Sequence, residues 1–254
     1  AVAVIGSRSE ERTVIDAPAP IDVLTSVDIR ASGRTETAQM IQALAPSFNF
    51  PRMSIGDGTD HVRPATLRGL GADQVLVLVN GKRRHTGALV NVNGSIGRGQ
   101  AAVDLNAIPA SMIDRIEVLR DGASAQYGSD AIAGVINLVL KSTAENEVQV
   151  TAGGNMTSFN PPRQNPLAPV DQTLSDGKVW QGNATWSVPL RTGYLTLGAE
   201  ARQHGFTNRS LPDTRTQYLA GNPKNADPAY NKQINHRLGD ASTSDVTGFV
   251  NFGR

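Results

Sequence analysis

The sequence predicts a compact α+β domain, with a mixed sheet and short helices, followed by long antiparallel β-strands. Three observations carry this prediction. Residues 113–141 contain two strand-like runs around a glycine-punctuated turn. Beyond residue 145, apolar and polar residues alternate over long segments. The connections between these segments are long, then short, then long again, which is typical of transmembrane β-barrels.

Composition narrows the function classes. The 254 residues include 24 basic and 23 acidic side chains, for a formal net charge of +1. A nucleic-acid-binding protein usually has a basic excess, so no nucleic-acid partner is expected. The densest basic run, Lys82-Arg83-Arg84, is interpreted as an exposed strand end beyond a turn. The chain has no cysteine, which excludes disulfides and thiolate metal sites.

Membrane and targeting segments of the usual helical kind are not expected. No apolar run reaches the ~18 residues of a membrane-spanning helix, and no basic-then-apolar signal peptide opens the chain. We therefore expect residue 1 to be the start of a mature protein or of a shortened chain.

The N-terminal domain is predicted as short elements. Ile21–Thr25 alternates like a strand, and Val27–Ser32 forms a helical turn. Thr35 is positioned to cap a second helix that ends at Pro46. The other predicted elements are the buried strand Val75–Val79, the Asn80-Gly81 hairpin turn, the return strand Lys82–His85, the strand Arg115–Arg120, the helix Ala123–Tyr127 and the strand Val135–Lys141.

Four later segments read as barrel strands. They begin at Val148 and continue with Val179–Leu190, Tyr194–Arg202 and Asp245–Phe252, each with one apolar and one polar face. Four strands leave an open edge, which lipid does not tolerate. We therefore expect the chain to be the N-terminal part of a longer protein.

The connections favour a barrel over a soluble β-sandwich. Gly153–Lys178 and Phe206–Ser242 are predicted as long loops, and Arg191–Gly193 as a tight turn. A sandwich with one polar face explains the alternation equally well. It explains poorly why such long connections alternate with a three-residue turn.

Three blocks carry a resemblance to a known family. They are Leu67–Gly71 (LRGLG), Val75–Arg83 (VLVLVNGKR) and Ile113–Leu140, which contains I-x-R-I-E-V-x-R, then Y-G, then G-V-I-N. In this order and spacing they resemble the TonB-dependent outer-membrane receptors of Gram-negative bacteria. The chain has Arg120-Asp121-Gly122 where the family usually has Arg-Gly-Pro, a difference confined to one turn.

The resemblance implies a domain organisation. Residues 1–8 are expected to be a TonB-box region, residues 9–144 a plug domain, and residues 145–254 the first strands of a 22-stranded barrel that encloses the plug. The implied partners are TonB with its proton-driven inner-membrane complex, the outer-membrane lipid and a small-molecule substrate. No cofactor is implied.

The same resemblance assigns roles to individual residues. In the family, the charges corresponding to Arg115, Glu117 and Arg120 pair with carboxylates of the barrel wall, and Arg68 is a similar candidate. The alternative is a solvated strand face. The segment expected to add a strand to TonB comprises Val2, Ala3, Val4 and Ile5. Its alternative is a frayed N-terminal strand of the plug.

Several polar residues are expected to face the substrate from plug loops: Asp57, Asp60, His61, His85, Asn91 and Asn93. The four histidines are scattered, so no metal site is expected. The segment around Asp57 lacks the downstream glutamate of a calcium loop. No Ser/His/Asp set or phosphate loop has usable spacing, so no enzyme activity is expected.

The resemblance implies active uptake of a scarce nutrient across the outer membrane, most often a ferric siderophore in this family. Aromatic compounds, oligosaccharides and cobalamin are alternative substrates. A signalling receptor of the same architecture would need a further N-terminal domain. A soluble plug-type binding module would not need the strands after Glu145.

Overall fold

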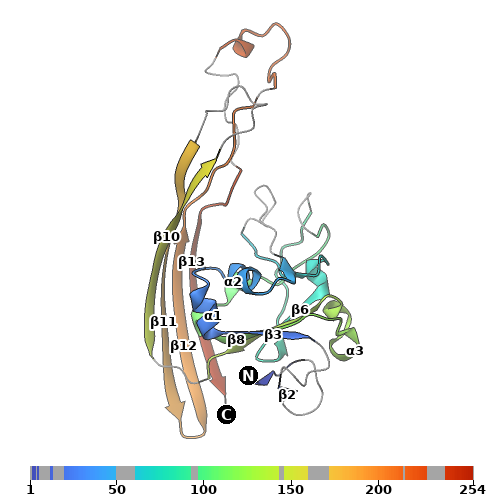
Figure 1. Ribbon diagram of the computed structural model, residues 1–254, viewed down its shortest axis with the longest axis vertical. Coiled ribbons are helices and arrows are strands. Elements are labelled where there is room, and N and C mark those ends of the chain that lie inside the picture. The colour runs from blue at the N-terminus through green and yellow to red at the C-terminus, as the bar shows by residue number, and fades with distance from the viewer. Residues whose placement is uncertain are drawn as a thin grey trace.

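The computed structural model describes residues 2–3, 5, 12–13, 20–49, 61–92, 97–142, 146–159, 172–213, 215–227 and 238–253. Within these residues the chain forms two bodies side by side, a mixed α/β domain and a tall curved sheet (Figure 1). We call the first body the plug and the four-stranded sheet the wall.

The plug is built from short strands and helices, as the sequence predicts. Its strands are β1 (Val2–Ala3), β2 (Arg12–Thr13), β3 (Ile21–Thr25), β4 (Phe48–Asn49), β5 (Thr66–Leu67), β6 (Val75–Val79), β7 (Lys82–Arg83), β8 (Ile113–Leu119) and β9 (Gly134–Leu140). Its α-helices are α1 (Ser26–Ala31), α2 (Thr37–Leu44) and α3 (Ser124–Tyr127). Its 3-10 turns are η2 (Ala72–Gln74), η3 (Leu105–Ala107), η4 (Ala110–Met112) and η5 (Ser129–Ala131).

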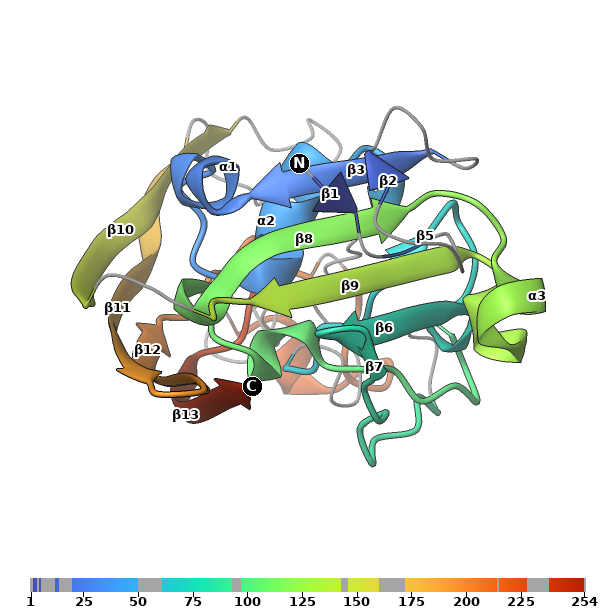
Figure 2. The same cartoon turned by 90° about the horizontal axis from the view of Figure 1, so that it is seen from below.

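The central sheet of the plug has the strand order β3-β8-β9-β6-β7, seen from below in Figure 2. β8 is antiparallel to β3 and β9, and β9 is parallel to β6. The Asn80-Gly81 turn joins β6 to β7, and both residues have positive φ angles. The predicted hairpin and the predicted pair of strands around the α3 turn are confirmed.

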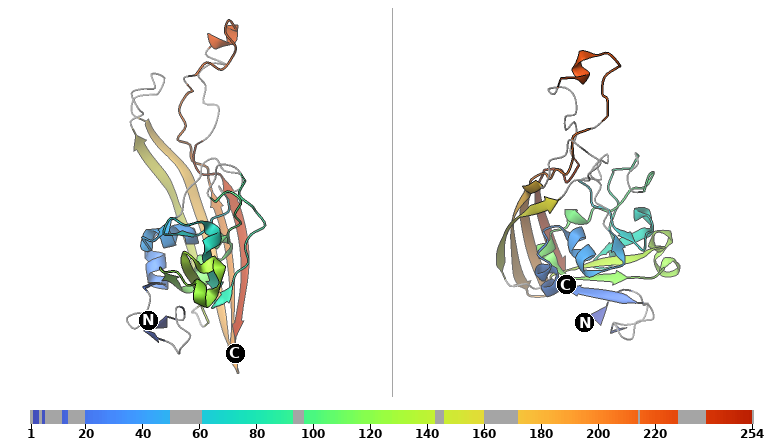
Figure 3. Two further views of the ribbon diagram at one scale, coloured as in Figure 1. Left: turned by 90° about the vertical axis from the view of Figure 1, so that its right-hand side faces the viewer. Right: turned by 45° about the horizontal axis from the view of Figure 1, so that its top comes forward.

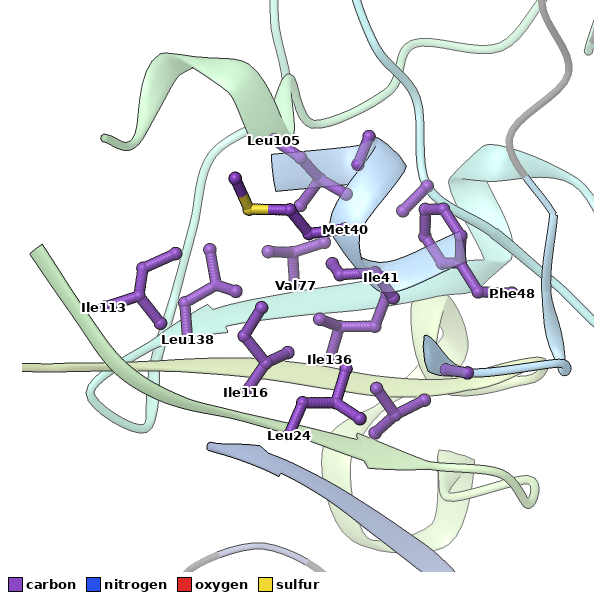
Figure 4. Packing of buried hydrophobic residues seen from close by; sticks show 14 of the residues in the cluster. Leu24, Met40, Ile41, Phe48, Val77, Leu105, Ile113, Ile116, Ile136 and Leu138 are labelled. Atoms are coloured by element: carbon purple, nitrogen blue, oxygen red, sulfur yellow. The ribbon is translucent and has the colours of Figure 1, made fainter. Parts of the chain in front are cut away.

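Apolar side chains cover both faces of this sheet. On one face Ile116, Ile136 and Leu138 pack under helix α2, which contributes Met40 and Ile41 (Figure 4). A second cluster contains Ile5, Ile21, Leu76, Leu78, Leu119 and Val135. Because a fully covered sheet needs apolar residues on both faces, VLVLV in β6 is apolar at every position.

The two helices before β4 differ in how they begin. Thr25 and Asp28 form a reciprocal capping box at the start of α1. α2 begins at Thr37, and Glu36 occupies the N-cap without a side-chain capping bond. The prediction that Thr35 caps this helix is wrong, because the helix starts one residue too late for it.

The wall contains β10 (Glu147–Phe159), β11 (Gln172–Leu190), β12 (Gly193–His204) and β13 (Thr243–Gly253), paired antiparallel in chain order. The predicted tight turn at Arg191–Gly193 is confirmed, because β11 ends at Leu190 and β12 begins at Gly193. The predicted loop Gly153–Lys178 is wrong at both ends, because β10 and β11 stay paired as far as Phe159 and Gln172 across a register shift at Gly153 and Asn155. Glycine and asparagine there weaken the local strand signal without preventing pairing.

The two faces of the wall differ as the alternation predicts. Val148, Val246 and Phe252 on the outer face are 78%, 86% and 79% exposed. The inner face, toward the plug, is polar and buried; its members include Gln181, Asn183, Thr185, Thr196, Glu200, Arg202 and Asn251. The chain that follows β12 carries the turn η6 (Pro223–Asn225) and projects beyond the wall (Figure 3).

Among the described residues, no helix combines the length and apolar character needed to cross a membrane.

Gly134 at the start of β9 is expected to be irreplaceable. Its φ is +143°, and an added Cβ would collide with the carbonyl oxygen of Leu119. Gly134→Ala should therefore destabilise the plug by about 1–3 kcal/mol or more. Thermal unfolding of the full-length protein, monitored through protease cleavage of the plug, measures this loss of stability. Gly87→Ala, whose Cβ would lie an ordinary 3.5 Å from Ala102, should change little; equal effects would contradict the explanation.

Candidate functional site between the plug and the wall

The predicted clamp residues Arg115 and Glu117 lie in the middle of the plug sheet. Arg115 Nε lies 2.9 Å from Glu117 Oε1, and Glu117 is 0% exposed. The second carboxylate oxygen accepts a 2.9 Å hydrogen bond from the Asn137 amide. This ion pair is therefore satisfied inside the plug.

Arg120 and Arg68 form pairs at the plug surface. Arg120 Nε lies 3.0 Å from Asp22 of the neighbouring strand β3, and Arg68 lies 3.7 Å from Asp121. Such part-exposed pairs contribute about 0–1 kcal/mol each. Pairing of the four clamp residues with other parts of the barrel stays a prediction.

The sequence did not predict a wall charge that reaches the plug. Arg202 on β12 binds the Asp245 carboxylate of β13 through Nε and Nη2, at 3.2 and 3.0 Å. Its remaining nitrogen, Nη1, donates to the carbonyl oxygen of Thr35 in the plug at 3.2 Å. Arg202 is 6% exposed. It is an inward-facing charge on a predicted strand, and that position is the one signal that indicated a buried partner.

Glu36 lies beside Arg202 on the plug side. Its carboxylate accepts hydrogen bonds from Arg63 Nε and from Asn106 Nδ2, both at 3.1 Å. Glu36 and Arg63 are 5% and 4% exposed. The missing capping bond of α2 is explained, because the Glu36 side chain is directed to Arg63 instead.

Burial and nearby positive charge shift the pKa values of the plug carboxylates Glu36 and Asp104 in opposite directions. Burial alone would raise the pKa of Glu36, but Arg63, Arg202 and the Asn106 amide together hold this pKa below its usual value. Burial raises the pKa of Asp104, and its hydrogen bonds from backbone N–H groups only partly offset that effect. Glu36 is therefore the charged partner of the arginines.

These residues surround a cavity of about 310 Å³ at the boundary. Its lining includes Glu36, Arg63, Asp104, Arg202 and Asp245, together with the predicted substrate-facing residue His61. Within the described residues, no cluster of His, Asp or Glu is arranged to hold a metal ion. The cavity can hold water or polar groups between the two bodies.

The other predicted substrate-facing residues are dispersed. His85 lines a separate cavity of about 490 Å³ beside the end of β13. Asn91 is buried, and its backbone bonds the loop around Gln100. Asp57, Asp60 and Asn93 lie outside the described residues.

Three further contacts lie at or next to the boundary between plug and wall. Met112 of η4 lies against Gly198 of β12, where an added Cβ would collide with the Met112 sulfur. Asn80 Nδ2 donates to Asn251 Oδ1 of β13 at 3.2 Å. Thr196 Oγ1 also donates to the Ser142 carbonyl at 3.1 Å, next to the junction of the two bodies.

The predicted TonB-binding segment lies against the plug where it is described. Val2 and Ala3 pair with Thr13 and Arg12, and Ile5 is buried in the second apolar cluster. Val4 lies outside the described residues. In this arrangement the backbone of the segment is already used in a two-residue strand pair.

Arg202 is expected to be the most costly wall charge to remove. Arg202→Met leaves the part-exposed Asp245 carboxylate and the Thr35 carbonyl without this donor, which should cost about 1–3 kcal/mol. The thermal midpoint for plug cleavage in the full-length protein measures the effect. Arg215→Ala is the matched control, because Arg215 is 81% exposed and pairs with Asp213 within one loop. A loss no larger than that of the control would refute the role of Arg202.

The interaction of Glu36 with Arg63 and Arg202 should make the stability of the plug against the wall depend on acid pH. Because the folded pKa of Glu36 is lowered, its stabilisation is complete above the unfolded value of ~4.3 and is lost as pH falls through the folded pKa. Arg202→Met should raise that pKa and move the acid transition to higher pH. Plug cleavage measured from about pH 6 to about pH 3 reports this. An unchanged transition in the variant would contradict the assignment.

The chain is similar in sequence to known proteins. Residues 13–135 match the family model of the TonB-dependent Receptor Plug Domain. The chain is 28% identical over 193 residues to the ferric enterobactin receptor PirA of Pseudomonas aeruginosa, covering 76% of this chain and 24% of that protein. It therefore spans about a quarter of the length of this curated relative.

Solved structures show the same fold. A mutant of the ferric enterobactin receptor PfeA of Pseudomonas aeruginosa, in complex with enterobactin, matches 80% of this chain and 28% of its own, with 23% identity and a TM-score of 0.52. A second PfeA mutant matches 82% and 28%, with 23% identity and a TM-score of 0.54. The family comprises outer-membrane receptors, which are not enzymes. Residues 13–135 of the chain therefore form a TonB-dependent receptor plug domain, and the chain is similar to ferric siderophore receptors.

Proposed function

We propose that the full-length protein is a TonB-dependent transporter that takes up a ferric siderophore across the outer membrane. The observation that carries this proposal is a plug seated by buried polar contacts on the inner face of a strand wall whose outer face is apolar. A soluble binding module would expose that apolar face to water. A plugged barrel places it in lipid.

The proposed substrate class is taken from the names of similar proteins. The curated relative is named a ferric enterobactin receptor, and one of the similar structures holds enterobactin. We therefore propose a ferric catecholate siderophore of this kind as the cargo. Aromatic compounds, oligosaccharides and cobalamin are the alternative outcomes of a transport test.

TonB is the proposed source of energy. It would bind the segment around Val2–Ile5 by adding a strand, an interaction in which backbone hydrogen bonds dominate. Because Val2 and Ala3 pair with residues 12–13 and Ile5 is buried, the segment would have to leave the plug before TonB binds it. Pulling on it would then load β3 and the sheet.

Uptake of ⁵⁵Fe-labelled ferric enterobactin tests the transport proposal. Cells that carry the full-length protein should accumulate the label only when TonB is present. Ile5→Pro removes a backbone donor from the proposed TonB-binding strand, so uptake should fall at least about tenfold while binding at the cell surface is retained. Ile5→Val is the matched control and should be near normal.

Two results would contradict parts of the proposal separately. Absence of ferric enterobactin binding, with uptake of one of the alternative nutrients, would overturn the substrate. Normal uptake by Ile5→Pro, or uptake without TonB, would overturn the proposed energy coupling.

A further inference from the structure

A short line of polar groups crosses the two central strands of the apolar plug sheet, β8 and β9. Glu117 of β8 stands opposite Val23 of β3 on one side and opposite Asn137 of β9 on the other. Asn137 in turn stands opposite Leu78 of β6. Glu117 and Asn137 are both 0% exposed. The polar line therefore runs from β8 across β9 toward the β6–β7 turn, and the edge strand β3 borders it through Val23.

The hydrogen bonds along this line are continuous. Arg115 Nε binds Glu117 Oε1 at 2.9 Å, and Asn137 Nδ2 donates to Glu117 Oε2 at 2.9 Å. The other end of the same amide, Asn137 Oδ1, accepts a 3.0 Å hydrogen bond from the backbone N–H of Gly81. Asn137 thus connects the buried carboxylate directly to the turn.

The turn continues the line into the wall. Asn80, with φ +50°, accepts a 2.8 Å hydrogen bond from the Leu140 N–H through its Oδ1. Its Nδ2 donates to Asn251 Oδ1 on β13 at 3.2 Å. Asn251 Nδ2 donates to the Lys141 carbonyl oxygen at 3.0 Å. Each of the two asparagines therefore binds both a side chain of the other body and a backbone group.

Burial makes the inner part of this line rigid: Glu117 and Asn137 are fully buried and Asn251 is nearly so, whereas Asn80 and Gly81 of the turn are exposed. A buried donor or acceptor that loses its partner costs about 1–3 kcal/mol, and more when the partner is charged. Hydrogen-bonded groups in a low-dielectric interior also strengthen one another. A displacement of β8 that moves Glu117 would therefore have to move Asn137 with it or break a buried hydrogen bond, and Asn137 is tied to the turn by a part-buried one.

We propose that these residues form a positioning relay that couples strand β8, the neighbour of the N-terminal edge strand β3, to the wall at Asn251. Its members are Arg115, Glu117, Asn137, the Asn80-Gly81 turn and Asn251. Arg115 and Glu117 thus act on the wall indirectly, through amides. Its use in transport rests on the proposed function, because β3 would receive the pull of TonB first; the coupling itself exists without substrate or TonB.

Hydrogen–deuterium exchange in the full-length protein tests the relay. Asn251→Ala should raise exchange about threefold or more in β3 and β8, although neither strand touches Asn251 through a recorded bond in the described residues. Asn183→Ala is the matched control: Asn183 is another inward-facing wall asparagine, and among the described residues its side chain makes no hydrogen bond to the plug. It should leave β3 and β8 unchanged.

Two further variants make the test decisive. Asn80→Gly keeps the positive φ of the turn and removes the amide, so it should reproduce Asn251→Ala even if that variant folds poorly. Glu117→Gln, with the wall intact, should raise exchange at residues 80–83. In the double variant Glu117→Gln/Asn251→Ala, exchange in β3, β8 and residues 80–83 should rise no further than in the more strongly affected single variant. Both substitutions break the same line, so their effects should not add.

The relay is overturned if Asn251→Ala and Asn80→Gly raise exchange only at residues 80–83 and 140–141, or if Glu117→Gln leaves the turn unaffected. Because no uptake is measured, this outcome is distinct from failure of the transport proposal. If the exchange changes occur as expected but the protein transports none of the nutrients tested, the relay stands and only the proposed substrate is overturned.

Discussion

The structure depends on one constraint: the polar inner face of the wall is buried against the plug, so its charges and amides require partners there. Arg202 satisfies this by binding Asp245 within the wall and the Thr35 carbonyl across the boundary. Asn251 does the same with Asn80 and Lys141. Burying such groups without partners costs more than most single apolar contacts supply, so these pairings fix where the plug sits.

Apolar packing sets the shape within this polar frame. The plug sheet is covered on both faces, with α2 on one side and Ile5 with its neighbours on the other. Met112 reaches the wall where Gly198 leaves room for it. The N-terminal segment therefore belongs to the packed plug in this arrangement, and its release would expose part of an apolar cluster.

Much of the fold follows from the sequence because its signals are local. Alternation identified the wall strands and their two faces, and Asn80-Gly81 identified the hairpin. The partners of the site could not be predicted in this way. Arg202 was visible as an inward-facing charge, but its contact with Thr35 joins residues 167 positions apart. Arg115 and Glu117 were expected to reach the wall, whereas alternation could not reveal that Asn137 completes their pairing inside the sheet.

The central claim is that one face of the wall meets lipid and the other meets the plug. Nitroxide labels on single cysteines introduced from residue 246 to 252 of the full-length protein in bilayers test it directly, and residues 1–254 contain no cysteine that would also be labelled. We expect high oxygen accessibility at 246, 248, 250 and 252, and low accessibility to oxygen and to a water-soluble nickel complex at 247, 249 and 251. Absence of this two-residue period, or access of the nickel complex to the outer positions, would contradict it.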